Sequence, residues 1–576
     1  MSRFFASVKR LANIFVENAF RTKPMKVIHA EENSQDLPRS LSLFDLVCIG
    51  VGGTVGSGIF ATTGNIISGT AGPAAVISWT IAGVVVIMNA FAYMELTTRV
   101  PSSGSTYAYA YHTLGELPAV VAAWLLTLEY GMSGAGVARS WAGKMEEWLM
   151  EDYPNHDFHW MNLQYSNFLA ALIMALSAAV LLVGVRFGKL FVNSIASLKV
   201  LIVLFIIIAG FAYMEPSNLS PFVPSREDGA FGGQGVITGA SSAFFGYIGF
   251  DEVCCLAAEA KNPKKTMPRA VMLVVTITMF LSVFASLVLS GMTEYTDAKS
   301  FSNGFTAQGA VWAAKIVHAG ETVTMPIVVL ISFLAQPRLN YALACDGLMP
   351  QIFAKVDDKG NLFINTLISG AFFTVVAFIV PFDILWDIVN FGIFLSFIMS
   401  NSAVIIVRTR KASPKAAPIA IAVMVASSLI AAFSYQIGYV TDGHDWMLPF
   451  AIVFLVIAVA ACLFIAIKCP QEANDPDNYT APLVPFLPLL AILADFYLMA
   501  QQRPLALKLS LAWVGAAILS YLVYGYGNSA GRTGWSALLH YIPHDGSSRS
   551  PMISFNEVTP SMTAMLKEKH DSTPKL

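Results

Sequence analysis

Charged residues are scarce in this chain of 576 residues. Only 12% of the residues are charged, whereas 56% are hydrophobic. A soluble domain of that length would need far more charge to cover its surface. Apolar runs recur along the sequence, and many approach the ~20 residues that a helix needs to cross a ~30 Å hydrocarbon core. The composition therefore indicates an all-α, polytopic integral membrane protein surrounded by lipid.

Signatures of other protein classes are missing as well. The sequence has no P-loop, no metal-spaced group of histidines and no nucleophile elbow, which argues against an enzyme. It also has no basic patch with interleaved aromatic residues outside the loops that we assign to the cytoplasm. The six cysteines fall in apolar runs or at their expected cytoplasmic ends, so a disulfide framework is not implied. We expect no catalytic residue, metal, cofactor or nucleic-acid partner.

Apolar runs that are long enough to span a membrane number about 14. Their expected starts are Leu43, Ala74, Pro118, Ser166, Leu190, Gln234, Thr266, Met325, Leu362, Leu385, Ala416, Met447, Pro482 and Leu505. An even number of spans places both termini on one side, and most of the 35 lysines and arginines lie on that side. The positive-inside rule then predicts that both termini are cytoplasmic.

The pattern divides the chain into four parts. Residues 1–42 form an amphipathic cytoplasmic segment, with Phe4, Val8, Leu11, Ile14 and Phe15 on one helical face. A cleaved signal peptide is not expected there, while a mitochondrial presequence is the alternative. Residues 43–410 form a ten-helix core. Residues 411–526 form four additional spans that support the core or mediate homo-oligomerisation, and residues 527–576 form a disordered cytoplasmic tail.

Glycine is concentrated in the middle of the first span. Residues 49–60 read IGVGGTVGSGIF, and each glycine costs roughly 1 kcal/mol relative to alanine inside a helix. We expect a break near Gly56, Ser57 and Gly58. Unwound backbone persists in a membrane only where it lines a protein-walled cavity, and the N–H groups that begin the second half-helix suit a carboxylate. Close packing of helices on small residues is the alternative for this stretch taken alone.

A second span is interrupted in the same way. Residues 241–253 read SSAFFGYIGFDEV, with Gly246 and Gly249 in mid-span. Two interrupted spans in one polytopic chain are typical of a transporter whose site lies at mid-membrane.

Six stretches of sequence occur in a characteristic order. They are GVGGTVGSGIF, AGPAAVISW, ELTTRVPSSGSTYAY, FFGYIGFDEV, EAKNPKKTMPRAV and PRLNYALACDGLMP. In that order they resemble the amino acid, polyamine and organocation transporter superfamily, and most of all the cationic amino acid transporter family and its bacterial homologues. The likeness covers about residues 41–410. It implies a leucine-transporter-like core, in which two sets of five helices have opposite orientations and spans 1 and 6 are broken.

The resemblance places a substrate site at the two breaks. The backbone of Gly56, Ser57, Gly58 and Ile59 would bind the substrate carboxylate. The substrate amino group and side chain would meet Val51, Gly52, Phe244, Phe245, Gly246, Tyr247, Gly249, Glu252, Ser332, Phe333 and Gln336. Glu252, just below the second break, would favour a cationic side chain. Phe333, if it faces the pocket, would favour a small neutral one.

A lysine lies inside span 5. A lysine within the membrane costs roughly 2.5–3.5 kcal/mol unless it is paired or neutralised, so Lys199 should have a function. The resemblance places its ammonium where sodium-coupled relatives hold a cation, against carbonyls of residues 50–53 and against span 8. Desolvation allows a lysine to release its proton, which makes Lys199 the candidate coupling residue. A permanent structural cation is the alternative. For Glu129 and Arg139 in span 3, pairing with neighbouring helices is the simpler expectation.

Together these patterns predict a secondary transporter that works by alternating access. The expected substrates are cationic amino acids such as arginine, lysine and ornithine, taken up without sodium and with coupling to protons. The plasma membrane is the expected location, with a vacuolar or lysosomal membrane as the alternative. A neutral amino acid or polyamine transporter, and an amino acid sensor that does not transport, stay open as alternatives.

Overall fold

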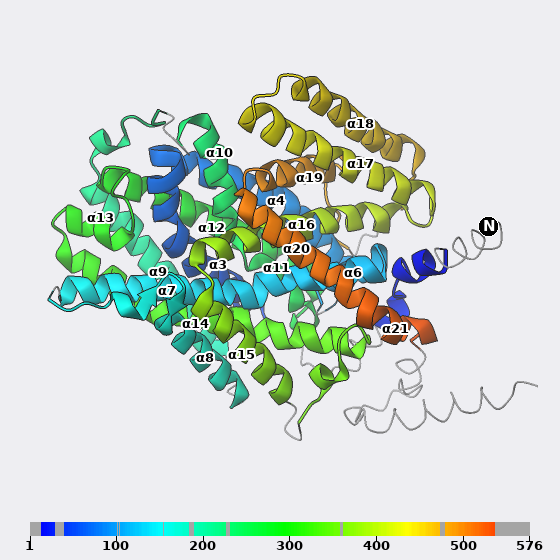
Figure 1. Ribbon diagram of the computed structural model, residues 1–576, viewed down its shortest axis with the longest axis horizontal. Coiled ribbons are helices and arrows are strands. Elements are labelled where there is room, and N and C mark those ends of the chain that lie inside the picture. The colour runs from blue at the N-terminus through cyan, green and yellow to red at the C-terminus, as the bar shows by residue number, and fades with distance from the viewer. Residues whose placement is uncertain are drawn as a thin grey trace, which may run out of the picture.

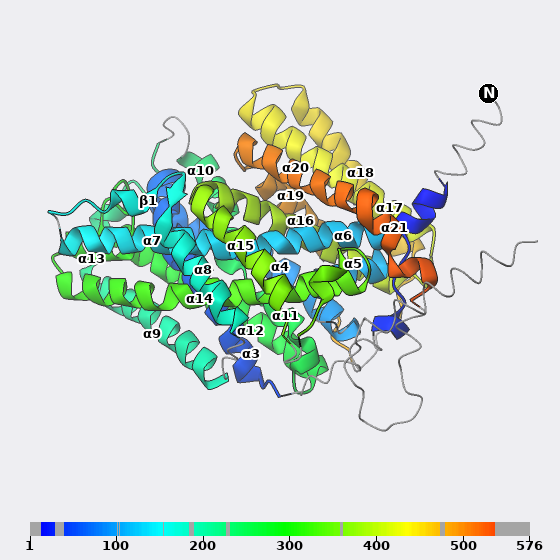
Figure 2. The ribbon, with the colours of Figure 1, turned by 60° about the horizontal axis from the view of Figure 1, so that its bottom comes forward.

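The computed structural model describes residues 13–28, 40–100, 102, 104–153, 155–183, 189–225, 231–357, 361–472 and 478–535. Figures 1 and 2 show long helices that run beside one another along the longest axis of the molecule. Within the described residues the only strands are β1 (Asn162–Leu163) and β2 (Ser166–Asn167), which pair as one short antiparallel hairpin. The all-α expectation therefore holds for the described chain, apart from this hairpin.

Helices fill the chain in the order that the apolar runs predict. Up to the hairpin and just beyond it they are α3 (Leu43–Ile66), α4 (Ala75–Arg99), α5 (Thr106–Thr113), α6 (Glu116–Thr127), α7 (Ser133–Asp152), α8 (Phe168–Leu182) and α9 (Lys189–Tyr213). The next set is α10 (Gly232–Ala243), α11 (Phe250–Cys255), α12 (Pro263–Met292), α13 (Phe301–Ala307), α14 (Val311–Cys345), α15 (Phe363–Ile379) and α16 (Phe382–Thr409). The last are α17 (Ala416–Phe433), α18 (Met447–Lys468), α19 (Phe486–Met499), α20 (Pro504–Ser520) and α21 (Tyr526–Asn528).

Nine stretches of the described chain are long and apolar enough to cross a membrane, and one of them, Leu43–Arg99, contains both α3 and α4. Three shorter apolar helices are α8, α15 and α19. Every expected span start lies in a helix or within four residues of one, but α14 begins at Val311, well before the expected Met325. Residues 311–324 continue the helix because the preceding interruption is at Gly309, whose φ is +73°.

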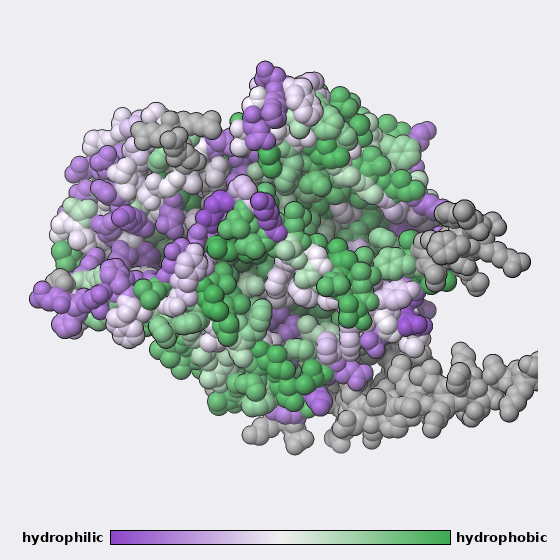
Figure 3. Space-filling model, viewed as in Figure 1, coloured by the Kyte–Doolittle hydropathy of each residue, from purple (hydrophilic) through white to green (hydrophobic). Residues whose placement is uncertain are grey.

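The outer surface of the helices is apolar. Green, hydrophobic residues cover the faces over α17 and α18 and over α8 and α15 in Figure 3, while purple residues gather at the left end of the molecule. On α18 the exposed side chains include Ile452, Val453, Val456 and Ile467. Such a surface suits lipid, because helices satisfy their own backbone hydrogen bonds within an apolar medium. The chain is an integral, multi-pass membrane protein.

Both ends of the described chain meet at one end of the molecule, which we call the terminal end (Figure 1). Phe15 stacks against Tyr526 with ring centroids 5.7 Å apart, and Asn18 donates a hydrogen bond to the Tyr526 hydroxyl. Residues 527–535, which the sequence assigns to a disordered tail, pack here: the amide of Ala530 donates to the Asp346 carbonyl at 2.9 Å. Of the expected amphipathic segment, residues 1–12 and 29–39 lie outside the described residues.

A buried salt bridge fixes the N-terminal segment at this end. Lys23 Nζ lies 2.7 Å from an Asp346 oxygen just beyond α14, and both side chains are almost fully buried. The Tyr107 hydroxyl on α5 donates to the second Asp346 oxygen at 2.6 Å. The Lys23 amide donates to the Tyr111 carbonyl at 2.9 Å. The N-terminal segment thus joins α5 to the end of α14.

Arg139 shows how one intramembrane charge is used. Its guanidinium on α7 donates to the carbonyls of Ala377 at 2.6 Å and of Phe378, which belong to the last turn of α15. It also donates to the carbonyls of Leu163 and Gln164 in the hairpin. Helix carbonyls in a last turn have no partner within the helix, so this arginine supplies donors that α15 lacks. Arg139 therefore pairs with neighbouring backbone, as expected.

We predict that Arg139→Met destabilises the protein by about 3–5 kcal/mol, because several buried carbonyls lose their donors together. The measurement is the thermal unfolding of the purified protein in detergent. Arg139→Lys is the matched variant: it keeps the charge but reaches fewer carbonyls, so its loss should be intermediate. Equal melting temperatures for the wild type and Arg139→Met would contradict this structural role.

Candidate substrate site at two broken helices

The first break lies within α3. Val55 has φ −76° and ψ 117°, and Gly56 has φ +121° and ψ −55°, so the helix stops and starts again between these residues. Side chains other than hydrogen are strained at that positive φ, which explains why glycine occupies the position. The break expected near Gly56 is confirmed. Residues 57–60 begin the second half-helix, and the first N–H groups of a helix have no partner within it.

The second break separates α10 from α11. After α10 the chain makes a single 3-10 turn, Phe244–Tyr247, then extends at Ile248 with ψ 133°. Gly249, with φ +126°, precedes α11. This break is also confirmed. The pair Ile248 and Gly249 repeats the backbone pattern of Val55 and Gly56, an extended residue followed by a glycine at positive φ.

The two broken helices touch through glycine. A Cβ atom placed on Gly58 would lie only 1.9 Å from the Cα of Gly246, and one on Gly246 would lie 2.3 Å from the Trp79 ring. The segments next to the two broken helices are also joined: the Leu41 amide donates to the Glu259 carbonyl at 3.0 Å, and the Lys261 amide donates to the Leu41 carbonyl at 2.8 Å. The backbone of one break is thus held against the backbone of the other.

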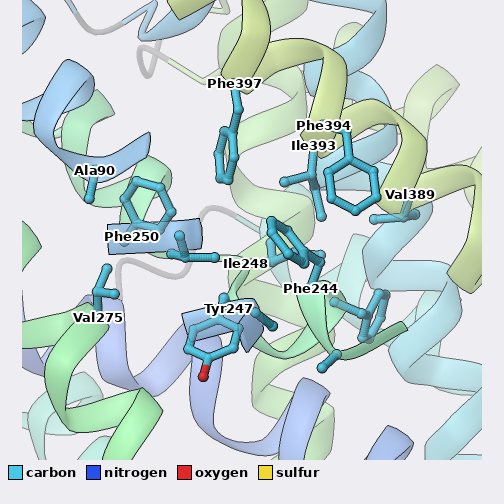
Figure 4. Close-up of a cluster of buried hydrophobic side chains, with 14 of the residues drawn as sticks. Ala90, Phe244, Tyr247, Ile248, Phe250, Val275, Val389, Ile393, Phe394 and Phe397 are labelled. Carbon is cyan, nitrogen blue, oxygen red and sulfur yellow. The ribbon is translucent and has the colours of Figure 1, made fainter. Parts of the chain in front are cut away.

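Aromatic side chains anchor the second break (Figure 4). The Phe244 ring packs on Phe394 of α16 with centroids 4.5 Å apart, and the Tyr247 hydroxyl donates to the Trp79 carbonyl on α4 at 2.9 Å. The Phe245 ring lies near Gly136 of α7. These three side chains, which the sequence places in the pocket, hold the turn against its neighbours. Any contribution of theirs to a site would come from the backbone.

Lys199 on α9 reaches the first break. Its Nζ donates to the Gly52 carbonyl at 2.6 Å, and the side chain is fully buried. The same nitrogen lies 3.6 Å from the Cβ position of Gly56, as does the Val328 side chain of α14. The ammonium therefore lies where α3, α9 and α14 meet, which agrees with the expected contact to carbonyls of residues 50–53.

Glu252 lies beside the next residue of α3. Its Oε2 atom is 3.2 Å from the Cβ position of Gly53, and the residue is 8% exposed. Glu252 and Lys199 are close enough to attract one another electrostatically. A lysine and a glutamate side chain therefore flank the stretch of α3 just before its break.

The α14 residues proposed for the pocket separate into two groups. Ser332 lies near Gly134 of α7, and Gln336 donates to Thr127 at 3.2 Å and to Asn340 at 2.9 Å. The Phe333 ring instead packs on Phe373 of α15, with centroids 6.0 Å apart. The pocket-facing Phe333 that would favour small neutral substrates is therefore not what the structure shows. A helix presents successive residues to different neighbours, and position 333 belongs to the α15 side.

Sequence reasoning missed a pair of acidic residues close to the breaks. Glu129 lies in the π-helical turn Leu128–Met132 between α6 and α7, and its carboxyl group lies close to Asp251 of α11. Both residues are almost fully buried, and Glu129 Oε1 and Asp251 Oδ2 have no hydrogen-bond partner among the described residues. The available signal was the DE pair at positions 251 and 252, directly after the second break. The sequence pattern predicts that Glu129 pairs with a neighbouring helix, but it does not identify Asp251 as the residue beside it.

Comparison with known proteins agrees with this arrangement. The family model described as amino acid permease matches residues 41–487, and a model of the C-terminus of such permeases matches residues 479–529. The chain belongs to the amino acid permease family. The family consists of transporters, so this member is not an enzyme, and the expected likeness to the larger superfamily and the cationic amino acid transporters is confirmed.

Individual relatives have different substrates in their names. A methylthioribose transporter of Bacillus subtilis is 36% identical over 417 residues, which are 70% of this chain and 88% of the relative. Human cationic amino acid transporter 4 is 32% identical over 433 residues, 73% of this chain and 67% of the relative. A branched-chain amino acid permease of Bacillus subtilis is 31% identical over 410 residues, 68% and 86% of the two chains. The family thus establishes that the chain is a transporter. The names of these relatives refer to a sugar, to cationic amino acids and to neutral amino acids.

We predict that Gly58→Ala, and more strongly Gly58→Leu, reduces uptake at least tenfold, because any side chain at this position forces the two breaks apart. Gly69→Ala is the matched control, since a Cβ there meets no atom within 4 Å. Uptake should be measured in proteoliposomes at equal protein content. Normal uptake by Gly58→Leu would remove the first break from the site.

Proposed function

We propose that this permease is a secondary transporter of cationic amino acids that works by alternating access, without sodium and with coupling to protons. The observation that carries the proposal is the contact of two broken helices at Gly58 and Gly246, beside a fully buried lysine. Alternating access requires a site whose walls move against one another, and half-helices on either side of a break can do so. The amino acid itself would be held between the two breaks.

Each end of an amino acid has a suitable partner there. The first N–H groups of the half-helix that begins at residues 57–60 carry the positive end of its dipole, which favours the substrate carboxylate. The 3-10 turn Phe244–Tyr247 ends in the extended Ile248, so its carbonyls are not all used within a helix and suit the substrate ammonium. Backbone groups recognise these two charges in every amino acid. Selection among amino acids must therefore come from side chains.

Glu252 supports a preference for cationic side chains. A buried carboxylate gains a charge-assisted hydrogen bond from a guanidinium or ammonium group, and the Phe333 ring packs on Phe373 of α15. Lys199 is the competing cation, since it already attracts Glu252. Two unit charges 4 Å apart repel by roughly 4 kcal/mol at an intermediate dielectric. A cationic substrate at Glu252 would therefore favour the uncharged form of Lys199, which links substrate binding to proton release.

The ammonium group of Lys199 also supports transport that is independent of sodium. Lys199 Nζ already uses the Gly52 carbonyl, and a sodium ion at that place would face its repulsion. Glu129 and Asp251 offer further carboxylate oxygens without hydrogen-bond partners among the described residues. We propose that Lys199 carries the coupling proton.

Neutral amino acid transport is the second candidate function. The branched-chain amino acid permease that resembles this chain favours it, and so does the charge balance if Lys199 neutralises Glu252 permanently. For location, we propose the plasma membrane with the terminal end in the cytoplasm. The basic segment Lys261, Lys264 and Lys265 follows α11 and the bridge between Leu41 and Ala260, and the positive-inside rule favours the cytoplasm for such a segment.

The preference for cations predicts that Glu252→Gln lowers arginine uptake about tenfold and alanine uptake less than twofold, because only arginine loses a charge-assisted contact. Competitive uptake of the two labelled amino acids measures the ratio. Glu259→Gln is the control: its carboxylate lies in the 3-10 turn Ala257–Glu259 beyond α11 and pairs with Arg338 at 3.8 Å. Equal losses for arginine and alanine in Glu252→Gln would indicate a structural carboxylate and favour the neutral candidate.

The coupling proposal predicts opposite responses to two gradients. In liposomes, an inward sodium gradient should leave wild-type uptake unchanged, while an acid-outside gradient should accelerate it several-fold. Lys199→Ala should lose most of that acceleration. Stimulation of the wild type by sodium would refute sodium independence. If neither gradient matters, the protein is a facilitator and Lys199 is a structural cation.

A further inference from the structure

Polar residues line one face of α14 along most of its length. His318, Glu321, Thr324, Ser332 and Gln336 are separated by three, three, eight and four residues, spacings that return to nearly the same side of a helix. All five are buried. Ser332 and Gln336 lie beside the π-helical turn and the start of α7, level with the proposed site. The other three continue this face toward the end of the molecule opposite the terminal end.

Glu321 differs from the rest of this face. It is 0% exposed, and neither of its carboxylate oxygens has a hydrogen-bond partner among the described residues. Thr324, one turn closer to Ser332, is also 0% exposed, and its hydroxyl has no partner either. Burying an ionisable group without a partner costs several kcal/mol. Intramembrane acids of this kind mark substrate or ion pathways rather than packing.

The surroundings of Glu321 carry more negative than positive charge. Lys144 and Glu147 belong to α7, which packs along α14, and Lys144 Nζ pairs with Glu147 at 3.7 Å. The Ser300 hydroxyl holds Glu147 from the other side at 2.5 Å. One turn further out, His318 Nε2 lies 3.1 Å from Glu151. Among these groups Lys144 is the one fixed cation, so the cluster suits an additional positive group.

We propose that Glu321 and Thr324 form an outer subsite for the ammonium or guanidinium group of a cationic substrate. The subsite lies about 16 Å along α14 from Ser332, at 1.5 Å per residue. It rests on the proposed function in one respect, namely that the substrate moves along the polar face of α14. Glu321 receives the positive group when the outer pathway opens, and Thr324 offers its hydroxyl oxygen on the way to Glu252. Substrate selection by charge then begins before the central site.

Agmatine, which has the guanidinium of arginine but no carboxylate, separates this subsite from the central one. External agmatine should inhibit alanine uptake by the wild type in proteoliposomes. In Glu321→Gln the concentration for half inhibition should rise about tenfold, while inhibition by external leucine should not change. Glu147→Gln is the matched control from the same cluster, and its half-inhibitory concentration should change less than threefold. Glu321→Asp should restore part of the sensitivity.

Three outcomes would overturn the subsite: agmatine does not inhibit the wild type, Glu321→Gln keeps full sensitivity, or Glu321→Gln loses sensitivity to leucine equally. Loss of agmatine sensitivity in Glu252→Gln alone would place the whole effect at the central site, and the proposed function would stand without the subsite. If no amino acid is taken up at all, the proposed function fails by itself. The subsite is then decided by the agmatine-induced rise in melting temperature of purified wild type and Glu321→Gln.

Discussion

The backbone at the two breaks is the constraint on which the rest of this structure depends. A helix that stops inside a membrane leaves peptide groups that lipid cannot satisfy, so both breaks have to be enclosed by protein. The contact of Gly58 with Gly246 brings the two interruptions together, and Trp79, Phe244 and Tyr247 hold the second one in place. Enclosing both breaks in one place concentrates the unused donors and acceptors of two helices where an amino acid could use them.

The buried charged residues around the two breaks fall into two groups. Arg139 is saturated by the carbonyls at the end of α15 and in the hairpin, and it works as part of the framework. Lys199, Glu252, Glu129, Asp251 and Glu321 are less completely paired. A buried charged group whose hydrogen bonds are all made adds rigidity to the structure. A buried charged group with missing hydrogen bonds costs free energy unless a proton or a substrate supplies the missing partner. This difference is the physical basis for assigning transport roles to the second group.

Local features of the sequence were enough to predict both breaks, because a glycine at positive φ is a property of single residues such as Gly56 and Gly249. The position of Lys199 followed from the resemblance and agrees with its bond to the Gly52 carbonyl. Neighbours from distant segments could not be predicted. Periodicity gives the face on which Phe333 lies but not that α15 covers it, and it cannot bring Glu129 next to Asp251. The packing of residues 527–535 could not be predicted for the same reason. Their partners, Asp346 just beyond α14 and Glu116 on α6, lie far away in the sequence.

The docking of both chain ends at the terminal end has a consequence for regulation. Lys23, Asp346 and Tyr107 connect the N-terminal segment to α5 and α14, and Ser529 donates to Glu116 from the C-terminal side at 2.6 Å. If opening of this end separates α5 from α14, these contacts must break as it opens. Thermodynamic linkage is reciprocal. Any partner that binds the released ends favours the open form. Any substrate that stabilises the closed form lowers the affinity of that partner for the ends. The exposure of the two ends of the described chain would then change with the transport state.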